Sequence, residues 1–283
     1  MDMEIKNAVS ASDTDAQYDE KAKRLLGNKM ILAHILVKTV DEFLGMDPKE
    51  AISYIEGDPF ISAVPLEPGL TNAAKEKDGI SQVIVNIEAQ KGEPAGYRIL
   101  NRAVFYVSRL ISSQKERDFV KMNYDDIRRV YSIWVCMGMN EGSMAHVHLA
   151  KDDILGSHQW EGGLDLLNIV MIGISDELPK HDDKYEMHRL LSATLSMELS
   201  VDEKLGILET EYGILLDDKT REEVVAMCNL SQGIREKGRA EGEVRFILNM
   251  YHKGYSLEQI ADVAGKSMEE VDAIIKGREP VLA

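Results

Sequence analysis

The sequence predicts an α/β protein in which a mixed domain of helices and strands is followed by a region of helices alone. Three segments rich in β-branched and apolar residues alternate with helical patterns, at residues 80–90, 130–138 and 166–174. Strands and helices in alternation are typical of a layered α/β domain. Beyond residue 183, the apolar residues recur at the three- and four-residue spacing of helices.

The charge balance limits the partners that the surface can bind. The 283 residues include 33 lysines and arginines against 49 aspartates and glutamates, for a net charge of −16. Such a surface repels phosphate, which excludes nucleic-acid binding over most of the molecule and leaves only a local contact. With 44% hydrophobic and 29% charged residues, the composition is that of a globular protein with a sizeable core.

Apolar stretches and cysteines indicate the compartment. The longest apolar stretches, such as residues 30–37 and 169–174, are far shorter than the roughly 20 residues of a membrane-spanning helix. The first 20 residues contain no apolar core of a signal peptide. Cys136 and Cys228 match no zinc or redox spacing. We therefore expect a cytoplasmic protein with reduced thiols, without a membrane span or a signal peptide.

The N-terminal part begins with a polar tail. Residues 1–16 lack periodicity and are expected to be disordered. Residues 18–44 have a helical pattern that Gly27 breaks or kinks. Pro48 suits the first turn of a short helix over residues 48–55, and a loop rich in glycine and proline follows at residues 57–79.

The segment 80–90 alternates between apolar and polar positions, as a half-buried strand does. Its polar face ends in Glu88 and Gln90. A helix is predicted over residues 97–114, with two stripes along it. The apolar stripe, expected to face the core, consists of Leu100, Val104, Val107 and Ile111. The basic and aromatic stripe consists of Arg98, Arg102, Tyr106 and Arg109.

Glu88 and Gln90 are candidates for a metal site. Residues two apart in a strand point the same way, with Cα atoms about 7 Å apart. Mg²⁺ prefers oxygen ligands, usually one or two carboxylates with water and substrate phosphate. Glu88 would bind the metal and Gln90 would orient water or phosphate. The alternative is a solvated polar strand face without chemistry, and spacing alone favours that alternative.

Several segments together resemble a known family, the Rpn-like recombination-promoting nucleases or putative transposases of the PD-(D/E)XK nuclease superfamily. The similarity runs through most of residues 18–232. It is carried by the segments YDEKAKRLLGNKMILAHIL (18–36), YIEG (54–57), IVNIEAQ (84–90), GYRILNRAVFYVSRLISSQ (96–114) and VYSIWVCM (130–137). The resemblance implies a restriction-endonuclease-like α-β-β-β-α-β core at residues 17–180, followed by a helical region at 181–283.

The resemblance also implies roles for individual residues in Mg²⁺-dependent hydrolysis of DNA. Glu88 matches the metal-binding glutamate of the family, and Gln90 matches its lysine or glutamine position. Asp19 matches an acidic residue at the start of the first helix. Arg102 and Tyr106 match an arginine and a tyrosine on the helix that follows the glutamate.

One departure from the family pattern bears directly on catalysis. Members of the family carry, before the glutamate strand, a strand of the type Tyr-Asp-Ile-Arg-Phe whose aspartate is the first metal ligand. This chain passes from Thr71 and Asn72 directly to the strand, so the first core hairpin is expected to be truncated. Asp78 is ten residues before Glu88, roughly 30 Å away along a continuous strand. Our hypothesis is a nuclease fold with an eroded site, and the alternative is a non-catalytic DNA- or protein-interaction module.

The charged residues around the strand have two interpretations each. Arg98, Arg102 and Arg109 are placed to meet a DNA backbone near Glu88. Equally, they would pair with acidic neighbours such as Glu93 and Glu116. Asp19 and Lys23, four residues apart, suit an ordinary intrahelical ion pair.

Other conspicuous residues are expected to be structural. His146 and His148 alternate on a presumed strand over residues 144–150, but no third ligand with fitting spacing accompanies them. We expect them to be surface residues. Tyr131 and Trp134 are within an apolar strand and are expected in the core.

The last two helices, within residues 255–275, have the layout of a helix-turn-helix. Each begins with a serine followed three residues later by Gln259 or Glu270, which predicts a capping box. The second helix is acidic, which argues against a role in reading DNA. Packing or homo-oligomerisation is the expected role.

Overall fold

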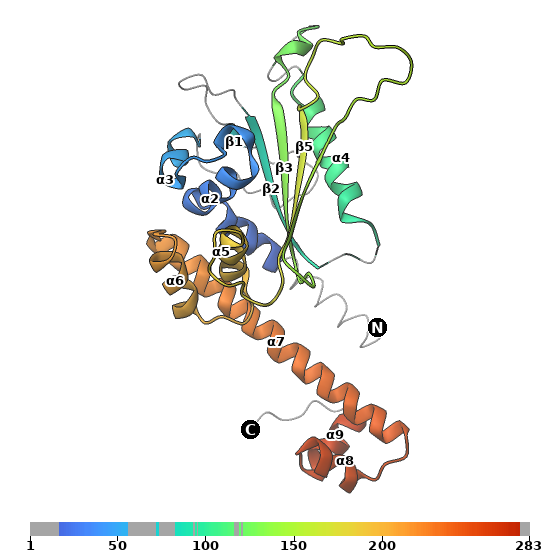
Figure 1. The fold of residues 1–283 in the computed structure, drawn as a ribbon. Helices are drawn as coiled ribbons and strands as arrows, with labels where there is room; N and C mark the ends of the chain where they lie inside the picture. The colour runs from blue at the N-terminus through green and yellow to red at the C-terminus, as the bar shows by residue number, and fades with distance from the viewer. Residues whose placement is uncertain are drawn as a thin grey trace. The chain divides into compact units, whose positions relative to one another are not determined.

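The computed structural model describes residues 17–55, 72–73, 83–92, 94, 96–115, 119 and 121–277. The chain divides into two compact units, Met1–Cys228 and Asn229–Ala283. The first unit is a mixed α/β domain and the second is helical (Figure 1). The predicted fold class is confirmed at this level.

A five-stranded mixed sheet forms the centre of the first unit, in the order β1-β2-β3-β5-β4. β2, β3 and β5 are parallel to one another, and the short β1 and the edge strand β4 are antiparallel to their neighbours. The strands are β1 (Asn72–Ala73), β2 (Val83–Lys91), β3 (Arg129–Met137), β4 (Ser143–His148) and β5 (Leu167–Gly173). The predicted strands are thus confirmed where they are described, and residues 80–82 lie outside the described part.

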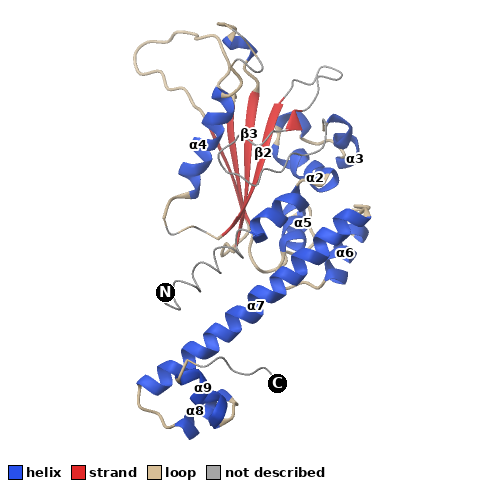
Figure 2. Ribbon diagram, turned by 180° about the vertical axis from the view of Figure 1, so that it is seen from behind, coloured by secondary structure: helices blue, strands red, loops and turns tan. Residues whose placement is uncertain are grey.

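Helices lie on both sides of this sheet. Helix α4 covers one face, and α2, α3 and α5 lie on the other side (Figure 1 and Figure 2). The helices of the unit are residues 17–26, α2 (Lys29–Thr39), α3 (Pro48–Ala51), α4 (Ile99–Ser112), α5 (Glu186–Leu195), α6 (Val201–Thr210) and the start of α7 (Asp218–His252), with the 3-10 turns η1 (Asp41–Phe43), η2 (Ile52–Tyr54) and η3 (Tyr124–Asp126).

The break at Gly27 between the first two helices is confirmed, and side-chain caps explain where the helices start. The Asn28 side chain accepts hydrogen bonds from the backbone N–H groups of Met30 and Ile31 at the start of α2. Asp47 does the same for Lys49 at the start of α3, with Pro48 in the first turn. Each cap pairs amide donors that a helix N-terminus leaves without partners.

The predicted apolar stripe of α4 is wrong in part. Leu100 and Val104 are 42% and 43% exposed. The buried residues of the helix are Ile99, Ala103, Val107 and Leu110. The buried face of α4 is rotated relative to the prediction, because the side chains of Arg102 and Tyr106 pack on Trp134 of β3.

A short strand that the sequence did not predict pairs with the glutamate strand, and it is as short as the expected truncation implies. β1 is a two-residue strand antiparallel to β2, with Asn72 opposite Val85 and Ala73 opposite Ile84. A shortened hairpin therefore precedes β2, and its first strand contains no aspartate. Asp78 lies outside the described residues.

Helices α5 and α6 belong to the same unit as the sheet, although the sequence placed the end of the α/β domain at residue 180. The Tyr18 hydroxyl donates to the Leu195 carbonyl at the end of α5. Arg189 of α5 binds Glu211, just after α6, through two guanidinium nitrogens at 2.6 and 2.7 Å. The compact unit as a whole ends at Cys228.

The second unit contains the end of α7 with α8 (Leu257–Ala264) and α9 (Met268–Ile275). Its small core consists of Ile247, Ile260, Ala261, Val271 and Ile274. Both predicted capping boxes are confirmed, since Ser256 pairs with Gln259 and Ser267 with Glu270. None of the helices in the described part of the chain has the length and apolarity needed to cross a membrane.

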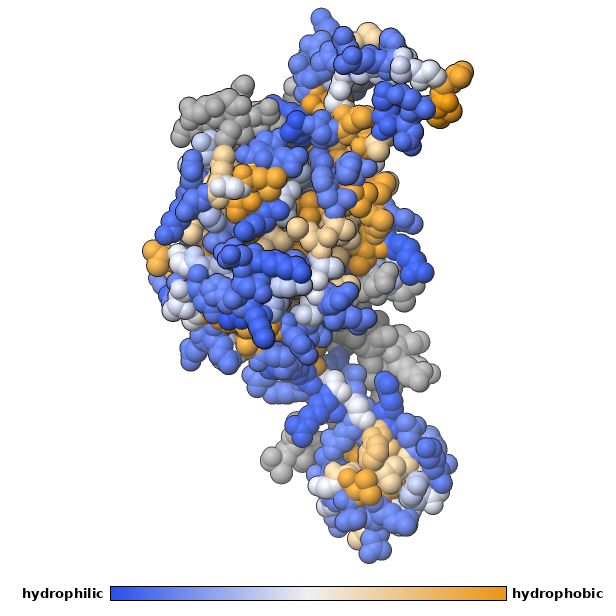
Figure 3. All heavy atoms as spheres, viewed as in Figure 1, coloured by the Kyte–Doolittle hydropathy of each residue, from blue (hydrophilic) through white to orange (hydrophobic). Residues whose placement is uncertain are grey.

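The loop between β4 and β5 has exposed apolar side chains. Ile154, Leu155 and Trp160 are exposed, and Figure 3 shows an apolar tip on this loop at the upper right. The loop follows β4, whose residues are themselves mostly exposed.

Candidate functional site

Glu88 lies on β2 beside the helix formed by residues 17–26. Its carboxylate forms an ion pair with the ammonium of Lys23, with 2.6 Å between Oε2 and Nζ. Both side chains are mostly shielded from solvent, which strengthens the pairing relative to a surface ion pair. The charge of this carboxylate is therefore balanced by a lysine of the first helix.

Asp19, on the same helix, contacts the backbone of β2. Its Oδ1 accepts a hydrogen bond of 3.2 Å from the backbone N–H of Lys91. The next amide, that of Gly92, donates towards β3, to the Met137 carbonyl. Because successive strand amides point to opposite sides, the Lys91 amide faces the outer edge of β2. Asp19 thus fixes the first helix to this edge.

Gln90 is held by Arg102 of α4. One guanidinium nitrogen donates to Gln90 Oε1 at 3.2 Å and to the Tyr97 hydroxyl at 2.7 Å. The other donates to the Tyr106 hydroxyl at 3.0 Å. The predicted neighbours Gln90, Arg102 and Tyr106 do come together, and their polar atoms bind one another.

Aromatic rings surround the Arg102 guanidinium. Its Cζ atom is 5.0 Å from the ring centre of Tyr106, 5.5 Å from Trp134 and 5.7 Å from Tyr97. Burial, the largest influence, lowers the pKa of Arg102, but the interactions with Tyr106 and Tyr97 raise it above its ordinary value overall. Cation–π contacts and hydrogen bonds thus fix a permanent positive charge at the end of β2.

The remaining basic residues of the predicted stripe, Arg98 and Arg109, are also on or next to α4. Arg98 is the exposed residue that precedes the first turn of α4. The guanidinium of Arg109 lies 5.9 Å from the ring centre of Phe105. The alternative partners Glu93 and Glu116 lie outside the described residues, so the second interpretation of these arginines stays a prediction.

Sequence reasoning missed three members of the group, Lys23, Tyr97 and Trp134. Lys23 is one helical turn after Asp19, and Tyr97 is five residues before Arg102. Trp134 is opposite Glu88 in the β2–β3 register. Its expected burial is confirmed, and the face of its ring also meets Arg102.

The donor set is poor for Mg²⁺. Among the described residues, no three or more His, Cys, Asp or Glu side chains are grouped so that they could hold a metal ion. Glu88 is paired with Lys23, and the amide oxygen of Gln90 accepts from Arg102. The side chains present here do not fit a magnesium ion bound in the manner of the family.

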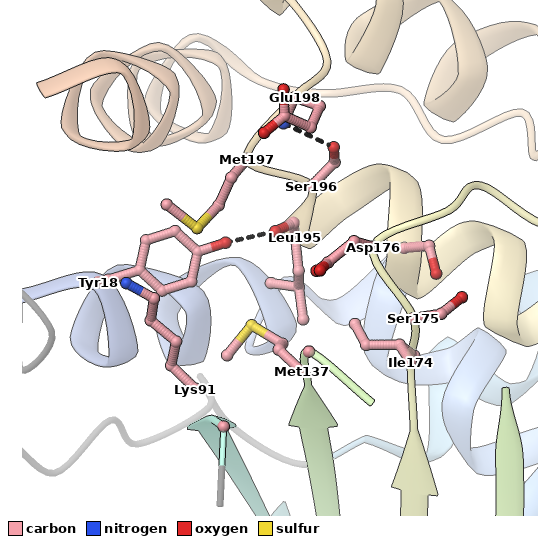
Figure 4. Close-up of a pocket in the computed structure, with 13 residues that line it drawn as sticks. Tyr18, Lys91, Met137, Ile174, Ser175, Asp176, Leu195, Ser196, Met197 and Glu198 are labelled. Carbon is pink, nitrogen blue, oxygen red and sulfur yellow. Dashed lines mark hydrogen bonds between the residues drawn. The ribbon is translucent and has the colours of Figure 1, made fainter. Parts of the chain in front are cut away.

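A cavity of about 420 Å³ opens at the carboxyl ends of β2, β3 and β5 (Figure 4). Loops at the carboxyl ends of parallel strands are the common location of ligand sites in α/β proteins. The strand ends contribute Lys91, Met137 and Ile174, and helix α5 with the loop after it contributes Ser192 and Met197.

Charged and aromatic groups line this cavity. The Lys91 ammonium lies 5.5 Å from the ring centre of Tyr18. Asp176 and Glu198 add carboxylates. Burial, with a smaller contribution from Asp19, raises the pKa of Tyr18, whose hydroxyl binds the Leu195 carbonyl. Tyr18 therefore stays a neutral donor.

Ser192 is an unusual lining residue. It is only 5% exposed, and its Oγ has no hydrogen-bond partner among the described residues. A buried hydroxyl without a partner costs about 1–3 kcal/mol of desolvation. The unpaired Ser192 hydroxyl at the wall of the cavity therefore lowers the stability of the folded state.

Replacing Ser192 with alanine is expected to raise the free energy of unfolding by about 1 kcal/mol, because the unpaired hydroxyl is removed. Chemical denaturation of the full chain measures the change. Ser196→Ala is the matched control. The Ser196 hydroxyl accepts from the amides of Glu198 and Leu199, so this variant is expected to be less stable. A loss of stability in Ser192→Ala would show that the Ser192 hydroxyl does have a hydrogen-bond partner.

The chain was compared with protein-family models, with curated proteins and with solved structures, and none of the three comparisons finds a match.

Proposed function

We propose that this chain is a nuclease-fold protein of the PD-(D/E)XK type whose hydrolysis of DNA is impaired. The element order supports the proposal. The first helix is followed by an antiparallel pair, β1 and β2, then by α4 and the parallel strand β3. Glu88 and Gln90 are near the end of β2, where the family resemblance places the Glu-x-Gln motif.

The ion pair between Lys23 and Glu88 is the observation that carries the proposal of impairment. A magnesium ion at Glu88 would have to compete with an ammonium 2.6 Å from the carboxylate. Mg²⁺ gives up its water reluctantly and needs carboxylate ligands to compensate. β1 supplies no aspartate, and among the described residues no group of three or more metal-binding side chains is found to share the role with Glu88.

A non-catalytic interaction module is the second candidate. The exposed side of α4 favours it, because Leu100, Val104 and Phe105 present apolar surface to solvent. Arg102 is close to this surface and provides a fixed positive charge. A docking helix of this kind would bind a protein, or a single phosphate group near Arg102.

A cleavage assay tests the first candidate. Full-length protein is incubated with supercoiled and with linear DNA in Mg²⁺ or Mn²⁺, beside Glu88→Ala. We expect the wild type to cleave no faster than Glu88→Ala, because Glu88 is held by Lys23. Metal-dependent cleavage that Glu88→Ala abolishes would overturn the proposal of impairment.

Lys23→Ala tests the role of the ion pair directly. Removing the ammonium leaves Glu88 available, so we expect Mn²⁺ to bind more tightly to Lys23→Ala than to the wild type, as measured by Mn²⁺ electron paramagnetic resonance. Lys21→Ala is the matched control, since Lys21 is on the same helix and pairs with Glu223 at 3.5 Å. Equal Mn²⁺ affinities in all three proteins would show that the pair does not restrict metal binding.

A gel shift at low salt separates the two candidates further. DNA binding by the full chain that Arg102→Ala weakens would favour a nucleic-acid role, since one phosphate contact would be lost. Absence of both cleavage and binding would favour the protein-interaction module.

A further inference from the structure

His146 and His148 lie side by side on the exposed edge strand β4. Strand alternation places both on one face, and their ring centres are 5.0 Å apart. Both side chains are exposed, as the sequence predicted. In the β4–β5 register, His148 is opposite Asn168 and His146 is opposite Val170.

The hydrogen bonds of Asn168 determine the proton position on His146. The side-chain amide nitrogen of Asn168 donates to the Asp165 carbonyl at 2.6 Å. This orients its oxygen, Oδ1, towards Nε2 of His146 at 2.9 Å. An amide oxygen only accepts, so Nε2 of His146 is the donor in this hydrogen bond and Nδ1 is the ring nitrogen left for a cation. A histidine whose second ring nitrogen donates to an oxygen in this way is the usual arrangement at a metal site.

The spacing of the rings also suits a shared cation. A histidine nitrogen binds zinc at about 2.0–2.1 Å, which puts the ring centre about 3.2 Å from the metal. Two such rings at a near-tetrahedral angle have centres about 5 Å apart. The observed separation is 5.0 Å.

We propose that His146 and His148 bind a divalent transition cation that prefers imidazole, such as Zn²⁺ or Cu²⁺. Nδ1 of His146 and a ring nitrogen of His148 are the ligands, and Asn168 orients the first ring. In the part of the chain that is described, the pair has no third side chain of the usual metal-binding types in a common group. Water completes the coordination, and the cation exchanges readily.

This site is independent of the proposed nuclease site. It uses nitrogen donors, which Mg²⁺ avoids and which Cu²⁺ and Zn²⁺ favour. None of its residues belongs to the group around Glu88 and Arg102. The result for one site therefore leaves the other untouched.

Calorimetric titration of the full chain with Cu²⁺ tests the proposal. We expect one site per chain, with an affinity that falls at least tenfold in His146→Ala and in His148→Ala. The Cu²⁺ resonance spectrum should show coupling to two nitrogens in the wild type and to fewer in either variant. Both residues are exposed, so these substitutions leave the core intact.

His158→Ala is the control, since His158 is an exposed histidine of the neighbouring loop. It is expected to bind Cu²⁺ as the wild type does, as is Glu88→Ala, and Mg²⁺ should produce no heat at this site. Unchanged Cu²⁺ affinity in both His146→Ala and His148→Ala, or an equal loss in His158→Ala, would overturn the proposal.

Discussion

Trp134→Ala is expected to lower the free energy of unfolding by about 3–5 kcal/mol, the range for removing a large aromatic side chain from a core. Trp134 is 0% exposed, at the centre of β3. It packs with Tyr106 at 5.6 Å between ring centres and supports the guanidinium of Arg102. Its indole N–H donates to the Ser132 hydroxyl. The variant removes packing between β3 and α4 and leaves a partly polar cavity.

The other tryptophan of the chain is the matched control. Trp160 is 74% exposed in the β4–β5 loop, so Trp160→Ala is expected to change the stability by less than about 0.5 kcal/mol. Urea denaturation monitored by circular dichroism measures both variants without relying on tryptophan fluorescence. Similar losses in the two variants would show that Trp134 is not a core residue.

Arg189→Met is expected to destabilise the α/β unit by about 2 kcal/mol at neutral pH, through the loss of a two-pronged, charge-assisted contact with Glu211. The contact joins α5 to the residue after α6. A third guanidinium nitrogen donates to the Pro179 carbonyl at 2.7 Å. Methionine keeps the apolar stem but makes none of these bonds.

The effect of Arg189 is expected to depend on pH. The hydrogen bond from Arg189 lowers the pKa of Glu211 below its ordinary value of 4.5. A depressed folded-state pKa stabilises the protein above the ordinary value, and this stabilisation is lost as the pH falls through the depressed value. The difference in stability between wild type and Arg189→Met should therefore be full at pH 7 and shrink below about pH 4.

Arg24→Met provides the comparison for this pH series. Arg24 pairs with Glu20 and Glu223 at an exposed position, where ion pairs contribute about 0–1 kcal/mol. We expect the free energy of unfolding of Arg24→Met to differ from that of the wild type by a small amount that is nearly constant across the pH series. A constant difference for Arg189→Met across the series would contradict the assigned role of Glu211.

The sequence was sufficient to predict the order of the helices and of the strands β2 to β5 in the described residues, but not the short strand β1. β-branched residues in β2, β3 and β5, the glycine break after residue 26 and the serine caps of α8 and α9 are local signals. The buried face of α4 was not predictable in the same way. Leu100 and Val104 have the spacing of a core stripe, but the flank shared by Arg102 and Tyr106 sets the rotation of this helix on the sheet.

The candidate site was predicted only in its components. Gln90, Arg102 and Tyr106 were expected together and are bonded to one another. The partner of Glu88 was not foreseen, because Lys23 has an acidic neighbour one turn away on its own helix. The Lys23–Glu88 pair joins residues 65 positions apart, and such a long-range contact leaves no periodic trace in the sequence.

The bond from Asp19 to the Lys91 amide has a consequence for solubility. In the described residues, β1 pairs with β2 only at Ile84 and Val85. In the part of the chain that the structure describes, no strand pairs with the rest of that margin, and an unpaired strand edge is a template on which another chain's backbone can assemble. The Asp19 carboxylate accepts the hydrogen bond of the Lys91 amide, which an incoming strand would need as a donor. This contact therefore disfavours pairing of β2 with a strand of another molecule.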